Sequence, residues 1–218
     1  MTRRVLALDA ALARSSAAVV VDGIVLAERS RDAARGHAAL LPTMARDVLH
    51  DAPGTLDFVA VTVGPGSFTG IRAGLALAHG IALGLGIPVV AVSVGEAMAA
   101  TLPPLPGRTL WCATDSRRDR VFLEIEGIVV AYDLSALPIP GGPVAIVGDA
   151  SIPVVARLAA RNHDVMLTAV RLPTAWAVAA AGTDRFEGRL PPRDAQPLYV
   201  DPPEAKLPAG GLRPPPAA

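Results

Sequence analysis

One eleven-residue segment combines glycines with hydroxyl and arginine side chains in a spacing that suits either anion binding or a tight turn. It consists of Gly64, Pro65, Gly66, Ser67, Phe68, Thr69, Gly70, Ile71, Arg72, Ala73 and Gly74. The segment lies between an apolar stretch and a helical one, where free backbone N–H groups and the helix dipole favour an anion. Its glycines allow the backbone to approach a ligand closely. Arg72 is then an anion ligand, a charge that faces a partner, or a solvated residue.

The established phosphate-binding motifs differ from this segment. A Walker A loop ends in Lys followed by Ser or Thr, and no such pair follows here. The dinucleotide fingerprint has a narrower glycine spacing than the glycines at 64, 66 and 70. A strand-to-helix turn with Ser67 or Thr69 as the N-cap explains the same residues without a ligand. Both interpretations remain open.

The histidines and hydroxyls argue against metal-dependent and nucleophilic catalysis. The four histidines are His37, His50, His79 and His163, and no two of them are four residues apart. No helix can therefore offer a paired-histidine metal site. Ser67 has no nearby histidine in the sequence to activate it. We expect no catalytic residue, no metal and no cofactor, with a bound nucleotide as the alternative.

The composition excludes a protein whose overall charge attracts nucleic acid or an anionic membrane. The 218 residues include 20 basic and 20 acidic ones, so the formal net charge is zero. Apolar residues make up 51%, enough for a sizeable core in one large domain or two small lobes. The single cysteine, Cys112, lies in an apolar run. We expect it to be a buried, inert thiol in a reducing compartment.

Neither an export signal nor a membrane span is expected. The N-terminus looks like a twin-arginine signal, but Asp9 and Arg14 interrupt the apolar region that such a signal requires. Residues 73–94 carry no formal charge and are long enough to span a bilayer. Pro88 and several glycines divide this stretch into a buried helix and a buried strand. We therefore expect a cytoplasmic protein without membrane contact.

The elements that position the glycine segment form an α/β lobe. Apolar stretches predict an antiparallel meander, with strands at 5–8, 17–21 and 24–27. Asp22-Gly23 supplies the positive φ angles of a tight turn. A helix over 37–49 follows, with Pro42 in its first turn. Its apolar face consists of Leu40, Leu41, Met44, Val48 and Leu49.

A βαβ unit then carries the glycine segment itself. It comprises a strand at 58–63, a helix at 69–85 and a strand at 88–92, which implies two parallel strands and a right-handed crossover. Ser93 is expected to cap a further short helix, because Glu96 stands at the capping-box position.

The second half repeats the pattern of strands followed by helices. A Pro-rich stretch at 101–108 is the expected boundary between lobes. The expected domains are a first lobe at 1–102, a smaller second lobe at 108–189, and an extended Pro-rich tail at 190–218. The second-lobe strands are expected at 110–114, 120–126, 128–131, 144–147 and 165–170, and the helices at 152–162 and 173–181.

The glycine segment 64–74 resembles the signature of the bacterial TsaB (YeaZ) family. Weaker matches occur in the same order as in the family, at 5–9, 36–42, 87–93, 115–122 and 197–200. The resemblance implies an α/β, actin-like, two-lobed fold of the sugar kinase and heat-shock ATPase type, degenerate and with a reduced second lobe. It also implies a non-catalytic subunit for threonylcarbamoylation of the adenosine at position 37 in tRNAs that read codons beginning with A.

The resemblance also implies partners. They are the catalytic subunit TsaD, bound as a heterodimer through first-lobe helices, and the ATPase TsaE, with tRNA reached through the complex. A homodimer is an alternative for the chain alone. The expected interface residues on those helices are His37, Leu40, Leu41, Met44, Val48, Leu75 and His79.

Two departures from the family pattern bear on the ligand question. Asp9 is followed by Ala10, Ala11 and Leu12 rather than by hydroxyl residues, which disfavours phosphate binding at the opening hairpin. Asp9 is therefore either a turn-former or a remnant ligand. Asp201 stands where the family usually has Arg. Two enzyme alternatives remain, a weak nucleotide-binding ATPase that uses Asp9 and a peptidase, and the sequence offers no metal ligands or triad for the latter.

Overall fold

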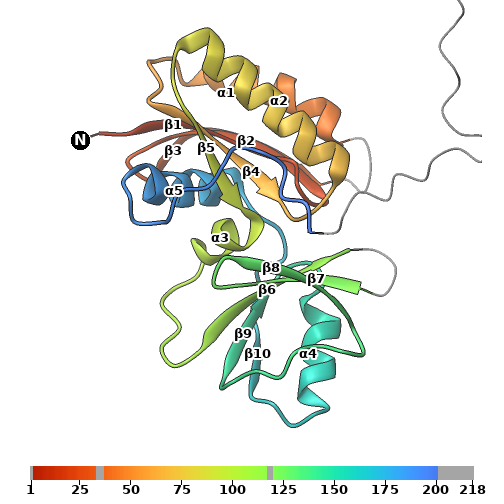
Figure 1. Ribbon diagram of the computed structural model, residues 1–218. Helices are drawn as coiled ribbons and strands as arrows, with labels where there is room; N and C mark the ends of the chain where they lie inside the picture. The colour runs from red at the N-terminus through yellow and green to blue at the C-terminus, as the bar shows by residue number, and fades with distance from the viewer. Residues whose placement is uncertain (1, 33–36, 117–119, 201–218) are drawn as a thin grey trace, which may run out of the picture.

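Two five-stranded sheets form two lobes, one above the other, in the computed structural model (Figure 1). The structure describes residues 2–32, 37–116 and 120–200, and the side chains of residues 37 and 38 are not among the described parts. Asp201 and residues 117–119, which fall within the family match at 115–122, therefore lie outside the described residues.

The first lobe contains the expected meander and βαβ unit. Its strands are β1 (Arg4–Asp9), β2 (Arg14–Val21), β3 (Ile24–Asp32), β4 (Phe58–Gly64) and β5 (Val89–Ser93), in the sheet order β3-β2-β1-β4-β5. Strand β4 pairs in parallel with both β1 and β5, whereas β1 to β3 are antiparallel. The helices between them are a 3₁₀ turn η1 (His37–Leu40), α1 (Leu41–Asp51), α2 (Phe68–Leu85) and α3 (Val94–Ala99).

Local sequence signals set the ends of these elements. Asp22 and Gly23 adopt φ angles of 49° and 79°, as the tight turn between β2 and β3 requires. Pro42 lies in the first turn of α1, where its missing N–H is harmless. Ser93 and Glu96 form the expected capping box at the start of α3. These expectations are confirmed.

The second lobe has the same sheet topology with fewer helices. Its strands are β6 (Thr109–Asp115), β7 (Arg120–Ile125), β8 (Ile128–Asp133), β9 (Val144–Val147) and β10 (Val165–Leu167), in the order β10-β9-β6-β7-β8. As in the first lobe, an antiparallel meander is followed by two strands that continue the sheet in parallel. The helix α4 (Ser151–Ala159) is the counterpart of α2, while residues 134–143 connect β8 to β9 without a helix. This lobe is therefore the reduced one.

The last helix, α5 (Ala175–Phe186), corrects the expected domain boundary. It packs beneath the first sheet, against β1, β2, β4 and β5, although its residues fall in the range 108–189 assigned to the second lobe (Figure 1). Its small residues, such as Ala177 and Ala181, pack against Val5 and Ala7 of β1. The sequence pattern identified an apolar helix there, but the sheet that covers it is more than 80 residues away in the chain.

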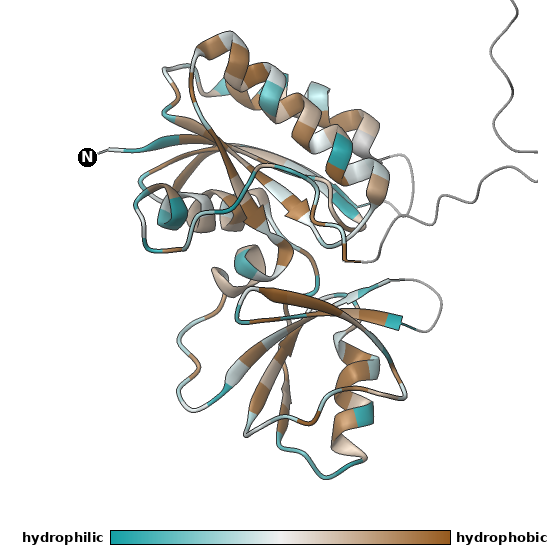
Figure 2. Ribbon diagram, in the orientation of Figure 1, coloured by the Kyte–Doolittle hydropathy of each residue, from teal (hydrophilic) through white to brown (hydrophobic). Residues whose placement is uncertain are grey.

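Helices α1 and α2 cover the opposite face of the first sheet, against Leu6 and Leu8. The expectation that α2 is a buried helix is only half right. Its inner residues pack on β4, whereas its outer residues lie in solvent, and brown, apolar residues predominate along it in Figure 2. Helix α2 is long and apolar enough to cross a membrane, but core helices of soluble proteins share these two properties.

Candidate functional site

The glycine segment forms the turn between β4 and α2, and its hydroxyl caps the helix. Ser67 is the N-cap of α2, and its Oγ accepts a hydrogen bond from the N–H of Gly70 at 3.2 Å. The N–H of Ser67 donates to the carbonyl oxygen of Ala11, in the turn between β1 and β2, at 2.6 Å. Two of the N–H groups that an anion would require are therefore satisfied within the chain. Ser67, rather than Thr69, is the cap.

Two glycines of the segment allow it to lie directly on the β1–β2 turn. A Cβ atom at Gly70 would lie 1.9 Å from the carbonyl oxygen of Ala10, and one at Gly66 would lie 2.2 Å from that of Ala11. Neither position can hold a side chain without movement of backbone, since real Cβ atoms do not approach oxygen so closely. The close approach made by these glycines is thus to the chain itself.

Asp9 lies beneath this contact and is completely buried. Its Oδ1 accepts hydrogen bonds from the Thr62 hydroxyl at 2.6 Å and from the Ala11 N–H at 3.1 Å. Its Oδ2 has no hydrogen-bond partner among the described residues. Burial raises the pKa of Asp9 to about 6, although the hydrogen bonds from Thr62 and Ala11 oppose this shift. The bond to Ala11, two residues on, is that of a turn-former.

Arg72, on the first turns of α2, is held by two aromatic rings. Its guanidinium carbon lies 3.7 Å from the ring centroid of Phe68 and 5.8 Å from that of Tyr199. Its Nε and Nη2 donate to the Tyr199 hydroxyl at 3.1 and 2.7 Å. No carboxylate pairs with Arg72 in the described part of the chain. The guanidinium of this exposed residue is therefore positioned by Phe68 and Tyr199 of the chain itself.

The C-terminal segment 195–200 closes over the signature and α2. The N–H of Leu198 donates to the carbonyl of Val63 at 2.8 Å, and His79 Nε2 lies 2.9 Å from the Ala195 carbonyl oxygen. With Phe122 of β7, the two segments line a hollow of about 140 Å³. Sequence reasoning included Tyr199 in a family motif but did not identify it as a site residue. The apolar run 197–200 within a Pro-rich tail was the available signal.

The structure corrects most of the expected interface residues. Four of them, Leu41, Met44, Val48 and Leu75, are buried in the first-lobe core, so the apolar face of α1 contacts the chain's own sheet. Leu40 and His79 are exposed, and the side chain of His37 is outside the described parts. Gly74 packs on Val61 of β4 and likewise faces inward.

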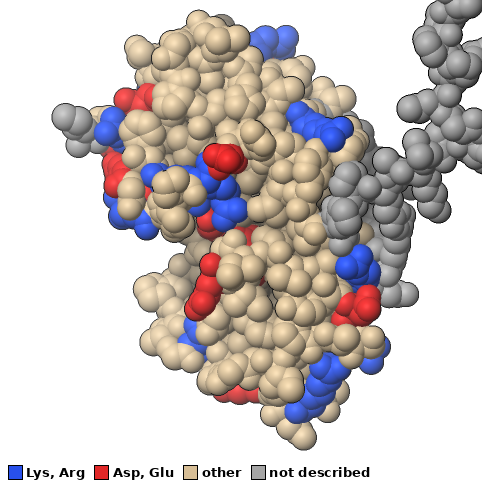
Figure 3. Space-filling view, viewed as in Figure 1, with Lys and Arg blue, Asp and Glu red and all other residues tan. Residues whose placement is uncertain are grey.

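The exposed apolar residues of α2 were missed by this reasoning. Leu83 is 86% exposed, and Phe68 and Leu85 are also largely in solvent. The space-filling view shows a largely uncharged surface over the first lobe (Figure 3). For Leu83 and Leu85, the signal in the sequence is the absence of charge from residues 73–94, a pattern that buried and partner-binding helices share.

The remaining chemistry-bearing residues do not gather near this region. Within residues 2–32, 37–116 and 120–200, no three His, Cys, Asp or Glu side chains group as a metal site would require. Cys112 is buried as expected, and burial raises the pKa of its thiol well above the usual value.

Comparison with known proteins gives matches over most of the chain. The family model described as TsaD, tRNA N6-adenosine threonylcarbamoyltransferase, matches residues 25–130. The uncharacterized protein Rv3421c of Mycobacterium tuberculosis is 36% identical over 157 residues, which cover 66% of this chain and 71% of that protein. The tRNA threonylcarbamoyladenosine biosynthesis protein TsaB of Escherichia coli is 35% identical over 123 residues, or 55% of this chain and 53% of the relative.

Solved structures agree with these relatives. YeaZ from Pseudomonas aeruginosa superposes with a TM-score of 0.74 at 26% identity, over 91% of this chain and 100% of that one. A ROK family protein from Streptococcus pneumoniae, in complex with sucrose, superposes with a TM-score of 0.50 at 7% identity, over 86% of this chain and 100% of that one, which concerns the fold alone. The fold is thus the expected actin-like one of the sugar kinase type.

Proposed function

Because the chain belongs to the TsaB (YeaZ) family, we propose that it is a non-catalytic scaffold subunit for tRNA threonylcarbamoylation, and that it binds a TsaD-type catalytic subunit. The biosynthesis of threonylcarbamoyladenosine in tRNA is the process in which the chain takes part. Its contribution there is to hold the catalytic subunit and to recruit a TsaE-type ATPase, while the catalytic subunit modifies adenosine 37 of tRNAs that read ANN codons.

The outer face of α2 carries this proposal. Leu83 lies on the outer face of α2, while Leu85 and Phe68 are exposed at the two ends of this helix, whose inner residues pack on the sheet. Single exposed apolar side chains need no explanation, but an 18-residue helix of predominantly apolar composition with three exposed large apolar side chains is a candidate protein-binding surface. Leu40, 37% exposed at the start of α1, is the one expected interface leucine that remains available to the same partner.

The internal hydrogen bonds of the signature support a scaffold rather than a nucleotide-driven enzyme. The Asp9 carboxylate lies under the β1–β2 turn, and the signature backbone donates to that turn. An anion would have to compete with bonds that already exist inside the chain. A formal net charge of zero favours contact with tRNA through the complex rather than through this chain alone. The proposed location is the cytoplasm, without membrane attachment.

Co-purification with a candidate TsaD-type subunit tests the proposal. Leu83→Asp places a charge on the outer face of α2 and is expected to weaken the complex at least tenfold. Ile152→Asp is the matched control, since Ile152 is also exposed, at 60%, but on α4 of the second lobe. It is expected to leave binding unchanged. Equal binding by both variants, with circular dichroism confirming that both are folded, contradicts the assignment of the surface.

The alternative function is a weak actin-like-fold nucleotide-binding protein or ATPase. The unpartnered Oδ2 of Asp9 is the observation in its favour. Incubation of the isolated protein with ATP and Mg²⁺ decides between the two. Hydrolysis that Asp9→Asn abolishes would establish the enzyme and remove the scaffold proposal.

A homodimer of the chain alone is a separate question. Sedimentation of the isolated protein, with and without Leu83→Asp, reports whether the chain forms a homodimer through the same face.

A further inference from the structure

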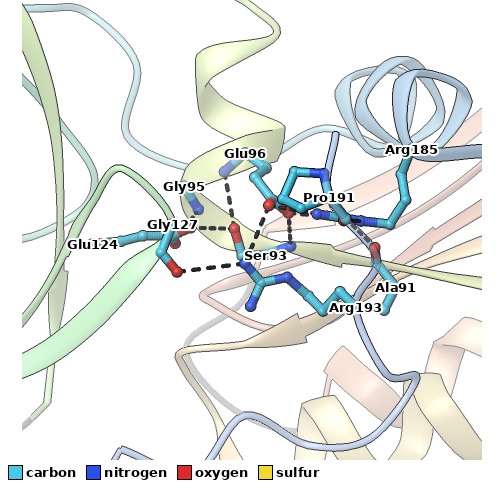
Figure 4. Close-up of polar contacts among 9 residues, drawn as sticks. All are labelled: Ala91, Ser93, Gly95, Glu96, Glu124, Gly127, Arg185, Pro191 and Arg193. Carbon is cyan, nitrogen blue, oxygen red and sulfur yellow. Dashed lines mark hydrogen bonds and ion pairs between the residues drawn. The ribbon is translucent and has the colours of Figure 1, made fainter. Parts of the chain in front are cut away.

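A buried carboxylate from the second lobe is inserted into the first turn of a helix in the first lobe. Glu124, on β7, is 4% exposed. Its Oε2 accepts a hydrogen bond from the N–H of Gly95 at 2.8 Å, and its Oε1 accepts one from the Ser93 hydroxyl (Figure 4). Both donors belong to the start of α3. This contact joins residues that are about 30 positions apart in sequence and in different lobes.

The fit leaves no room for a larger residue at position 95. A Cβ atom at Gly95 would lie 2.5 Å from both Cδ and Oε2 of Glu124. Gly95 has no need of a positive φ angle, because it is an ordinary helical residue. The reason for glycine here is therefore the close approach of the carboxylate.

A second polar contact lies next to the first. Glu96 Oε1 accepts hydrogen bonds from Arg185 of α5 at 2.6 Å and from Arg193, which follows α5 in the chain, at 3.1 Å. Arg193 Nη2 also reaches the carbonyl oxygen of Gly127, in the β7–β8 turn of the second lobe, at 3.5 Å (Figure 4). Arg185 is anchored in turn by the carbonyls of Ala91 and Pro191. The segment after α5 therefore connects both lobes.

Apolar packing completes the contact between the lobes. Met98 of α3 lies against Cys112 of β6, with their sulfur atoms 3.8 Å apart. Cys112 and Val147, from the second sheet, belong to the same apolar cluster as Leu6 and Leu8 of the first. The two lobes thus share a core instead of meeting across solvent.

We propose that Glu124, Gly95 and the Glu96–Arg193 pair form a lock that holds the two lobes at one fixed angle. The Glu124 and Glu96 carboxylates are both largely buried and hydrogen-bonded to specific partners, so a change of angle would separate these groups from their partners and cost free energy. Two separate contacts, on either side of α3, resist rotation in a way that one contact would not. The two lobes therefore behave as a single rigid body when a partner binds.

Distances between spin labels on the two lobes test the lock. His50→Cys on α1 and Ile152→Cys on α4 supply exposed attachment sites, and the buried Cys112 does not compete for the label. The protein with an intact lock is expected to give one narrow distance distribution. Glu124→Ala removes the carboxylate and is expected to broaden the distribution at least twofold.

Glu126→Asn is the matched control. Glu126 is an exposed acid two residues from Glu124, with a φ angle of 51° that Asn tolerates. Its distribution is expected to stay narrow. Gly95→Ala disturbs the same contact from the first lobe and provides the measurement if Glu124→Ala does not fold. Distributions in Glu124→Ala and Gly95→Ala as narrow as that of the parent protein would overturn the proposal, as would a broad distribution in the parent itself.

Discussion

Arg72 Nη2 donates a 2.7 Å hydrogen bond to the hydroxyl of Tyr199, 127 residues further along the chain. The pair ties the signature segment to the C-terminal segment, and the Phe68 ring also lies against the guanidinium, with its centroid 3.7 Å from the guanidinium carbon. The glycines and the arginine of this motif resemble an anion site. In the structure they contact the β1–β2 turn and the C-terminal segment. This arrangement and the buried Asp9 lead to four predictions.

The coupling between Arg72 and Tyr199 is measurable by a double-mutant cycle. Arg72→Ala and Tyr199→Ala each remove the stacking and the hydrogen bonds. We expect an interaction free energy of about 0.5–1.5 kcal/mol, because the pair is exposed and its cation–π and hydrogen-bond terms are modest there. Urea unfolding of the parent, both single variants and the double variant provides it. Strictly additive losses would show that the two side chains do not interact in solution.

Protonation of Asp9 makes stability depend on pH in an unusual direction. The pKa of Asp9 is about 6 in the folded protein, whereas an ordinary aspartate in the unfolded chain has a pKa of 3.8. The folded state therefore binds the proton more tightly than the unfolded state does. This contribution is complete below pH 3.8 and is lost as pH rises through 6. The loss amounts to roughly 3 kcal/mol at 1.36 kcal/mol for each pKa unit.

Asp9→Asn removes this titration. The free energy of unfolding of the parent, minus that of the variant, is expected to fall by most of that amount between pH 4 and pH 7.5. Denaturant titrations at several pH values measure the difference, in which the other titrating groups cancel. A difference that stays constant across this range would mean that the Asp9 carboxyl has an ordinary pKa.

Two glycines of α2 are expected to respond to alanine in opposite directions. Gly70→Ala would push a methyl group into the Ala10 carbonyl and is expected to cost about 1–3 kcal/mol or more. Gly80 has nothing within 4 Å of the added Cβ, so Gly80→Ala is expected to stabilise by about 0.5–1 kcal/mol through helix propensity. Thermal unfolding of the two variants compares them directly. A stabilising Gly70→Ala would show that the signature does not press on the β1–β2 turn.

Adjacent leucines at the start of α1 distinguish core from surface. Leu41 is 0% exposed and Leu40 is 37% exposed. Leu41→Asp buries an unpaired charge and is expected to lower the free energy of unfolding by several kcal/mol, enough to unfold a typical domain. Leu40→Asp is expected to change stability by less than about 1 kcal/mol. Circular dichroism and thermal unfolding separate the two. A folded, stable Leu41→Asp protein would mean that this side of α1 is free for a partner.

The sequence alone determined the features that depend on neighbouring residues. The Asp22-Gly23 turn and the Ser93–Glu96 capping box were predicted correctly, and Ser67 was one of the two residues predicted as the cap of α2. Each arises from φ angles or hydrogen bonds within four residues, so no knowledge of the rest of the fold is needed. The alternation of apolar stretches likewise predicted the two α/β lobes, and the glycine segment predicted the family.

Tertiary structure decided which surfaces those elements use. An apolar helix face such as Leu41, Met44 and Val48 indicates that the face is buried. The pattern is the same whether the face packs on a sheet of the same chain or on another protein. The return of α5 to the first lobe and the insertion of Glu124 beside Gly95 depend on contacts between distant residues. Such contacts depend on loop-closure entropy and on side-chain packing across the whole fold. Neither can be predicted from a short stretch of sequence.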